Sequence, residues 1–459
     1  MLCSRHWIWQ LGKGVTALAA GRCLGRSAEG VVRAMFSTGC IVRSRVPVMG
    51  LAGLAAVLMA VGCAGVTGSA SSHVATPTPL AAVPVPQTYF GMHVHHYLEG
   101  TPWPSEPMGT IRLWDSQTSW PDLEPSSGVW DFQRLDAYVA AAEAQQVRIL
   151  YELGGEVPQW ASAQPDQPSP YGPGTAAGPK NPADWENFVR TVATRYKGRI
   201  LEYEIWNEAD MPATYTGSLS DLVRLSRIAY QTLKEVDPSV TVVSPTSAGP
   251  VPDWLDGFLA AGGGSYADVI GYHFYDFPGL PENMIARFQA VRSVAAKYGI
   301  QEPIWDTEIG WGPGQVFSSS EQQAAFLART FLLHWSAGIP RANWYAWDNH
   351  SWVTLWVTET DDTTPTAAGR AYAEVQQWLV GNLLAGCAAD ATGAWSCTIT
   401  HANGAVDHAV WNPAGAAGFT VPRNWTVTAI RDLAGNVTAF PGGQVQIGES
   451  PVLLAAALP

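Results

Sequence analysis

The sequence predicts an α/β protein, a (β/α)8 barrel followed by a small C-terminal antiparallel β domain. The 459 residues suffice for a barrel of roughly 250 to 300 residues and one smaller domain. Up to about residue 385, apolar or β-branched runs alternate with amphipathic segments, which is typical of a parallel sheet covered by helices. Beyond that point, short runs punctuated by glycine replace the alternation.

The composition is that of a globular protein with an acidic surface. Hydrophobic residues make up 47% of the chain and charged residues 14%, which argues against disorder. The first 63 residues hold seven of the 26 Lys and Arg and one of the 39 Asp and Glu, so the rest carries 19 basic and 38 acidic residues. Such a surface disfavours nucleic acids and anionic membranes as partners and suits a neutral carbohydrate better.

Residues 1–63 are predicted to be a signal or leader segment. Arg43 and Arg45 precede the apolar run LAGLAAVLMAVG, which is the layout of a secretory signal and too short to span a bilayer comfortably. Cys63 follows the run MAVG, which resembles a bacterial lipoprotein cleavage site; cleavage after Ala70 is the alternative. We therefore expect an exported protein, secreted or anchored to the outer face of the cell membrane by a lipid on Cys63.

The barrel is predicted over residues 88–385, after a linker over 64–87 that is rich in Ser, Thr, Pro and Ala. Eight strands are expected near residues 88–95, 110–115, 148–154, 201–207, 240–246, 268–275, 303–309 and 341–348. Amphipathic patterns predict helices over 132–146, 185–198, 219–236, 283–299 and 321–338. The segment 101–109 lacks such a pattern and is expected to be mostly loop.

Residues 386–459 are predicted to form a small β-sandwich, because their short runs show no helical pattern. Support of the barrel is the expected role. A carbohydrate-binding module is the alternative, with three tryptophans as stacking candidates: Trp395, Trp411 and Trp425.

Cys387 and Cys397 flank a polar stretch, DATGAWS, that suits a hairpin. We predict a disulfide between them, formed in an oxidising compartment, with two free core thiols as the alternative. The six cysteines of the chain show no zinc spacing such as C-x-x-C.

Two glutamates stand where such a barrel carries its active site, at the C-terminal ends of strands. The fourth predicted strand ends in YEIWNEAD, which contains Glu208, and the seventh ends in PIWDTEIGW, which contains Glu308. Cleavage of a glycosidic bond needs one protonated and one ionised carboxyl on either side of the anomeric carbon. Because these strands face each other across the barrel mouth, we expect a separation of roughly 5 Å, the retaining distance. Two ordinary rim glutamates are the alternative.

The runs EIWNE and DTEIGW, with VPQW after the third strand, resemble glycoside hydrolase clan A and, within it, family thirty-nine and its relatives. The resemblance covers about residues 88 to 385. It implies that Glu208 is the acid/base and Glu308 the nucleophile of a double displacement through a covalent glycosyl-enzyme. That family contains β-xylosidases, α-L-iduronidases and polysaccharide endo-hydrolases, so it implies a carbohydrate substrate and no cofactor.

The same resemblance implies roles for four polar residues. Arg112, at the end of the second strand, would hold the nucleophile ionised; an internal salt bridge, for instance to Glu204, is the alternative. Asn207 would donate to the 2-hydroxyl of the sugar. His273 and Tyr275 stand two apart on the sixth strand and so share a face. His273 would line the sugar site, and the Tyr275 hydroxyl would hydrogen-bond the nucleophile. Core packing is the alternative for both.

Aromatic residues near the strand ends are expected to contact the sugar. The resemblance implies that Trp347 is the platform beneath the cleaved unit. Trp160, Trp311 and Trp352 lie in loops that would extend it, with loop packing as the alternative. The long loop 156–184 is rich in Pro and Gly, and we expect it to wall one side of the cleft.

His93 and His95 end the first strand as an H-x-H pair, and we expect them to bind substrate hydroxyls. Metal-dependent amidohydrolases carry such a pair there and are the rival class, but the fifth strand offers no further histidine. We therefore expect no metal. A catalytically silent sugar-binding barrel is the third hypothesis, although it would lack one of the two carboxylates. Sugar, linkage and endo or exo action stay open.

Overall fold

The computed structural model describes residues 80–457. The predicted leader with Cys63, and the linker as far as residue 79, lie outside the described residues. The last part of the predicted linker is structured: Leu80–Ala82 and Gln87–Tyr89 form short 3-10 turns. Val85 is buried and pairs with Val380. The chain thus joins the barrel before residue 88.

Eight parallel strands form the barrel, and each lies within its predicted range. They are β1 Phe90–His93, β2 Thr110–Leu113, β3 Arg148–Glu152, β4 Glu202–Glu204, β5 Thr241–Val243, β6 Ile270–Tyr272, β7 Ile304–Ile309 and β8 Ala342–Trp344. The order in the sheet is β5-β4-β3-β2-β1-β8-β7-β6. A parallel bridge between Val243 and Val269 links β5 to the residue before β6 and closes the barrel.

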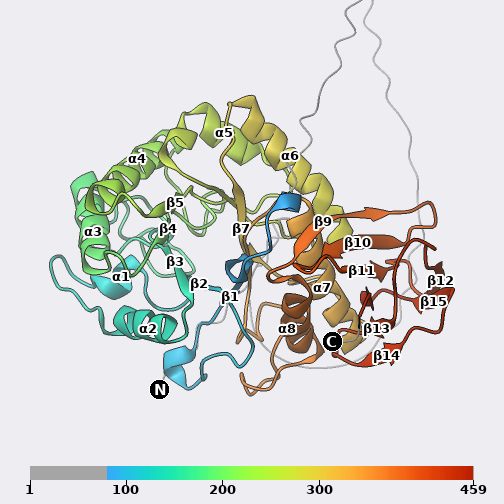
Figure 1. Cartoon of the computed structure of the whole chain (residues 1–459). Helices are drawn as coiled ribbons and strands as arrows, with labels where there is room; N and C mark the ends of the chain where they lie inside the picture. The colour runs from blue at the N-terminus through green and yellow to red at the C-terminus, as the bar shows by residue number, and fades with distance from the viewer. Residues whose placement is uncertain (1–79, 458–459) are drawn as a thin grey trace, which may run out of the picture. The chain divides into compact units, whose positions relative to one another are not determined.

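Helices surround the strands, as Figure 1 shows for α3 to α6. They are α1 Trp120–Leu123, α2 Gln133–Ala144, α3 Pro182–Arg195, α4 Leu219–Val236, α5 Asp253–Ala260, α6 Met284–Lys297, α7 Ser320–Ser336 and α8 Ala367–Leu379. The five predicted helices correspond to α2, α3, α4, α6 and α7. Ser218 and Ser319 cap α4 and α7 by accepting backbone N–H groups, as expected from their side chains. Only the turn Tyr97–Glu99 follows β1, so 101–109 is loop as predicted.

Helix α7 is buried on nearly every side. All residues from Ala324 to Trp335 are buried, including the charged Arg329. Its sequence is apolar all around because the barrel strands cover one face and the C-terminal domain covers another. The contact with that domain includes a hydrogen bond from the Cys387 N–H to the Ser336 hydroxyl at 2.7 Å.

The C-terminal domain is the predicted antiparallel β structure. Six strands pair in the order β14-β13-β16-β11-β10-β9, and β12 pairs with β15. They are β9 Leu383–Ala389, β10 Trp395–Thr400, β11 Val406–Trp411, β12 Ala417–Thr420, β13 Ala429–Arg431, β14 Val437–Ala439, β15 Gln444–Ile447 and β16 Val452–Ala455. Phe419 and Val445 of the small sheet pack with Val410 and Leu454 of the large one. Strand β9 begins three residues before the predicted start at 386.

The predicted disulfide is confirmed. Cys387 of β9 lies opposite Cys397 of β10 in the hairpin, with the two sulfurs bonded and the Cα atoms 4.1 Å apart. The bridge therefore joins two neighbouring strands next to α7.

The tryptophans of this domain serve packing more than surface recognition. Trp411 is fully buried, and its indole N–H donates to Glu282 of the barrel at 2.8 Å. Trp395 stacks on Trp411, and Trp425 stacks on His408. Several residues of the domain belong to the same apolar core as the barrel, which favours the supporting role. In residues 80–457, no helix combines the length and apolar character needed to cross a membrane.

A buried ion pair of the barrel, at its contact with Trp411 of the C-terminal domain, leads to the first prediction. Arg329 is inaccessible and donates to both carboxylate oxygens of Glu282, at 2.9 and 2.6 Å. Glu282→Gln leaves a buried charge without its counterion, so we expect a loss of about 3–5 kcal/mol in the free energy of unfolding. Denaturant titration measures this. Lys297→Gln, which breaks an exposed pair with Asp256, is the control and should change little. Equal losses in both variants would contradict the prediction.

Candidate active site

The fold brings Glu208 and Glu308 together. A carboxylate oxygen of each, and a ring nitrogen of His273, all lie within 4.8 Å of one another. Glu308 lies in β7, and Glu208 follows β4 with a φ of 40°, a rare backbone conformation outside glycine. The Thr246 hydroxyl accepts the Glu208 N–H at 2.9 Å and helps to fix this geometry. The close approach matches the short separation of retaining enzymes and not the longer one that accommodates a water.

Glu308 is surrounded by donors that favour its ionised form. The Tyr275 hydroxyl donates to one oxygen and the Arg112 guanidinium to the other, both at 2.8 Å. Burial and the charge of Glu208 raise the pKa of Glu308 to about 7, against the opposing effects of the Arg112 charge and the Tyr275 hydrogen bond.

Glu208 has a weaker set of partners. Its carboxyl hydrogen-bonds to Nδ1 of His273 at 3.0 Å, and burial lowers the pKa of that histidine, which keeps it neutral. Burial, together with the charges of Asp115 and Glu204, raises the pKa of Glu208 to about 7 against the opposing charge of Arg112. Only Glu308 contacts the cation directly, so these surroundings favour the negative charge on Glu308 over Glu208.

The sequence left two roles open for Arg112, contact with Glu308 or an internal salt bridge to Glu204, and Arg112 has both. It donates to Glu308 and also forms a buried ion pair with Glu204. The same guanidinium donates to the Asn207 side-chain oxygen at 2.8 Å, which places that amide beside the nucleophile. Glu152, at the end of β3, completes the set at 3.2 Å. Sequence reasoning missed Glu152, although its place at a strand end was the available signal.

His93 and His95 are buried at the same end of the barrel. The Nε2 atom of His93 lies 3.3 Å from the backbone oxygen of Thr307, which can only accept. Burial lowers the pKa of His93, so the ring is neutral and its Nδ1 is an acceptor. Within residues 80–457, neither His93 Nδ1 nor His95 Nε2 has a hydrogen-bond partner. Unpaired nitrogens are what the expected contact with substrate hydroxyls needs, and that contact stays a prediction.

Asp115, Tyr345 and Asn349 form a polar cluster that the sequence did not reveal. The Tyr345 hydroxyl donates to Asp115 at 2.6 Å and accepts from Asn349 at 3.2 Å. The Tyr345 ring packs against both His93 and His95, with centroids 5.1 and 4.9 Å apart. Asp115 comes two residues after β2 and Tyr345 directly follows β8, so their positions were the signal.

The tryptophan predictions need correction. Trp347 and Trp311 are 1% and 0% exposed, so neither offers a face to a sugar. Both are packed into the apolar core, which indole rings stabilise by the area they bury. Trp160 packs edge-on against Trp120 and donates to a backbone oxygen of Glu124. Loop packing thus explains it.

Trp352 fits the predicted platform better than the others. It is half-buried, and its ring contacts those of Tyr275 and Tyr345 at centroid distances of 5.4 and 5.6 Å. It therefore lies beside Tyr275, whose hydroxyl contacts Glu308.

The long loop 156–184 reaches the site through Tyr171. The Tyr171 ring packs edge-on against Trp114 at 5.5 Å. Burial raises the pKa of Tyr171, and the charges of Asp115 and Glu208 raise it further, so the ring lies within electrostatic range of the catalytic end. This position agrees with a loop that walls one side of the cleft.

Glu208, His273 and Glu308 also have the spacing of metal ligands. Their donor atoms are already engaged, however: both oxygens of Glu308 accept hydrogen bonds, and His273 Nδ1 bonds to Glu208. A guanidinium 2.8 Å from Glu308 would also repel a bound cation. The arrangement suits proton transfer better than metal binding.

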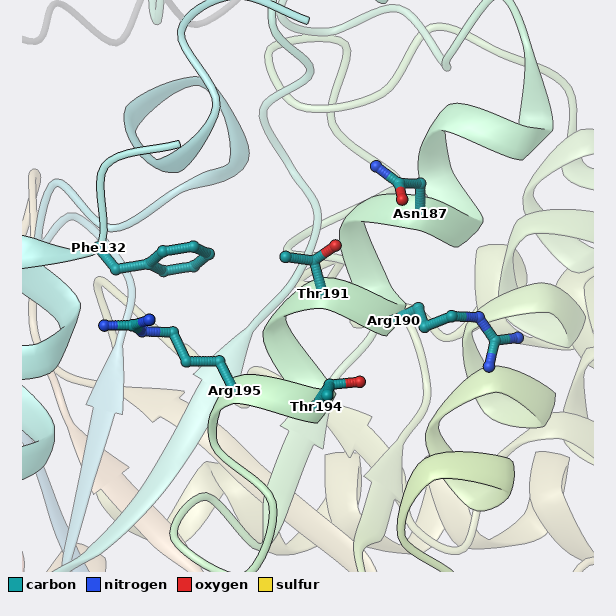
Figure 2. Close-up of a pocket in the computed structure, with 6 residues that line it drawn as sticks. All are labelled: Phe132, Asn187, Arg190, Thr191, Thr194 and Arg195. Atoms are coloured by element: carbon teal, nitrogen blue, oxygen red, sulfur yellow. The ribbon is translucent and has the colours of Figure 1, made fainter. Parts of the chain in front are cut away.

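A separate hollow of about 530 Å³ lies on the outside of the barrel, away from this chemistry (Figure 2). It is lined by Phe132, Asn187, Arg190, Thr191, Thr194 and Arg195. None of these carries a carboxyl group, and both arginines pair with acidic neighbours. The hollow therefore offers no machinery for bond cleavage.

Comparisons with known proteins agree with this geometry. Residues 177–372 match a family model described as the glycosyl hydrolase catalytic core, a range that contains both glutamates. The fold is similar to a family 39 glycoside hydrolase from the gut symbiont Bacteroides cellulosilyticus WH2, with 20% identity, 81% of each chain covered and a TM-score of 0.64. It is also similar to a family 39 enzyme from Xanthomonas axonopodis pv. citri, with 15% identity, 85% of this chain and 99% of that one, and a TM-score of 0.56.

A monomeric β-xylosidase from Caulobacter crescentus CB15 shares the fold as well, with 14% identity, 81% of this chain and 97% of that one, and a TM-score of 0.56. At these identities, the solved structures establish the architecture, and the family model matches the part of the barrel that carries both glutamates. The chain therefore contains a region that matches the glycosyl hydrolase catalytic core, and its fold is like that of family 39 enzymes.

Proposed function

We propose that the protein cleaves O-glycosidic bonds of an oligo- or polysaccharide by a retaining double displacement, with Glu308 as nucleophile and Glu208 as acid/base. The observation that carries this proposal is the pair of carboxylates within 4.8 Å of each other, in unlike surroundings. Glu308 meets a cation and a hydroxyl, whereas Glu208 meets a neutral imidazole.

The two steps follow from this difference. Glu308 attacks the anomeric carbon while Glu208 donates its proton to the leaving oxygen, which forms a glycosyl-enzyme and releases the aglycone. Ester formation removes the negative charge of Glu308, so the pKa of Glu208 falls and its carboxylate can accept a proton from water. That water then displaces Glu308 and releases the sugar with its original anomeric configuration.

The surroundings favour an uncharged sugar. Asp115 is half-exposed beside the site, and an anionic sugar would be repelled by it. The Arg112 guanidinium, which reaches Glu308, already holds Glu204, Glu152 and Asn207 within the protein. Neutral xylosides are sensible first substrates, because solved structures with this fold include a β-xylosidase and xylanases.

We also propose that the protein is exported, either secreted or held at the membrane by a lipid on Cys63. The leader pattern and the disulfide between Cys387 and Cys397 support export. Mass spectrometry of the protein from its native membrane fraction distinguishes a lipidated Cys63 from cleavage after Ala70.

Trapping with 2-fluoro sugars tests the mechanism. We expect an aryl 2-fluoroglycoside of the accepted sugar to add one sugar mass to the protein, on the peptide that contains Glu308. Glu308→Gln should remove turnover and adduct, whereas Glu99→Gln, at an exposed rim carboxylate, should leave both unchanged. Intact-mass analysis and peptide mapping measure this. An adduct on another residue would overturn the assignment of Glu308.

Replacement of Glu208 tests the acid/base. Because general acid–base catalysis contributes about 10²- to 10⁴-fold, Glu208→Ala should lower kcat/KM by that factor for a poor leaving group. The loss should be smaller with a dinitrophenyl leaving group, which needs no proton. Equal losses with both substrates would contradict the assigned role.

Tyr275→Phe should change the pH dependence in a defined direction. The Tyr275 hydrogen bond lowers the pKa of Glu308, so its removal raises that pKa. Activity needs ionised Glu308, hence the acidic limb of kcat/KM should move to higher pH in the variant. The limb reports the coupled carboxyl pair and not one residue alone. An unchanged limb would show that the hydroxyl does not stabilise the ionised nucleophile.

Tyr171→Ala should alter substrate preference. Loss of one aromatic contact of about 0.5–1.5 kcal/mol should change the ratio of kcat/KM between short and long substrates by roughly 2- to 10-fold. Gln164→Ala, an exposed position on the same loop, is the control. Identical kcat/KM ratios in wild type and Tyr171→Ala would show that Tyr171 does not contribute to substrate preference.

A further inference from the structure

Two buried glutamates beside the active site, Glu152 and Glu204, have no role in the proposed mechanism. Glu152 ends β3 and Glu204 ends β4, and they are direct partners in the register of these parallel strands. Both point into the barrel and are 3% and 0% exposed. The guanidinium of Arg112 lies within hydrogen-bond distance of both carboxyl groups. Two buried carboxylates that share one cation repel each other when both are ionised, which favours a proton on one of them.

The neighbouring guanidinium cannot satisfy every acceptor around it. The Nη2 atom of Arg112 has two hydrogens but lies near three acceptors: Glu204, Asn207 at 2.8 Å and Glu152 at 3.2 Å. Glu152 is the most distant of the three and has one other donor, the Gly154 N–H at 3.2 Å. Glu204 also takes the Arg112 Nε–H. Glu204 is thus the carboxylate of the ion pair, and Glu152 is the partner left to hold the proton.

We propose that Glu152 is a neutral carboxylic acid that donates its proton to Glu204, and that it acts as a positioning residue for the Arg112–Glu308 pair. This inference rests on the proposed function only for its effect on catalysis. The proton itself follows from the contacts of the buried cluster.

The charges facing the cluster explain what the proton does. Arg112 of β2 is the cation, and Glu204 and Glu308 are anions. His93 of β1 and His273, which follows β6, are neutral. A third anion at Glu152 would raise the pKa of Glu308 through repulsion and weaken the nucleophile. Burial and the neighbouring Glu204 raise the pKa of Glu152, whereas Arg112 and the bond from Glu152 lower that of Glu204 against the effect of burial.

Glu152→Gln tests this proposal, because an amide imitates the protonated acid by donating to Glu204. We expect kcat/KM within about threefold of wild type and an unchanged acidic limb. Glu152→Leu removes the donor and should lower kcat/KM by about tenfold or more, the effect of an unsatisfied buried carboxylate. A downward shift of the acidic limb in Glu152→Gln by more than about half a pH unit would show that Glu152 is anionic and overturn the proposal.

Infrared difference spectroscopy gives a readout that does not depend on turnover. Wild type minus Glu152→Gln at neutral pH should contain the C=O stretch of a protonated carboxyl. The control is Glu202→Gln: Glu202 is equally buried but paired with Arg341 at 2.8 and 3.0 Å, and its difference spectrum should contain only carboxylate bands. A missing protonated band for Glu152 in an active enzyme overturns this inference alone. The band in a protein that cleaves no glycoside would leave the inference intact and refute the proposed function.

Discussion

The buried guanidinium of Arg112 is the interaction on which the active site depends. Through it, β2 is joined to β3, β4 and β7, because its partners Glu152, Glu204 and Glu308 come from those strands. A charge without solvent must be matched by charges and hydrogen bonds within the protein, or the fold is strongly destabilised. The ion pairs and hydrogen bonds that satisfy Arg112 therefore stabilise the barrel interior and also fix the position of Glu308.

The different chemistry of Glu208 and Glu308 arises from their neighbours and not from the side chains themselves. Burial acts on the two in the same way, since it raises the pKa of each. The contact with Arg112 and Tyr275 distinguishes Glu308, and the neutral His273 next to Glu208 leaves that carboxyl its proton. Two strands in the right places thus supply a matched acid and base.

Much of the fold could be predicted from the sequence because strands, helices and caps are encoded locally. The eight strands lie within their predicted ranges, and Glu208 and Glu308 were identifiable from their place at strand ends. Exposure could not be predicted in this way, since the same indole can fill a core or bind a sugar. Trp347 and Trp311 were therefore misassigned, and Asp115 was missed because its partner Tyr345 is 230 residues away.

The order of strands in the C-terminal sheet has a consequence for synthesis of the chain. Strand β16, Val452–Ala455, follows the other described strands in the chain, yet it lies inside the sheet between β13 and β11. The sheet remains divided on the ribosome until these residues emerge, and the outer face of α7 lacks part of its cover for as long. The nascent barrel thus depends on residues 452–455, and chains terminated before them would present apolar surface to chaperones and proteases.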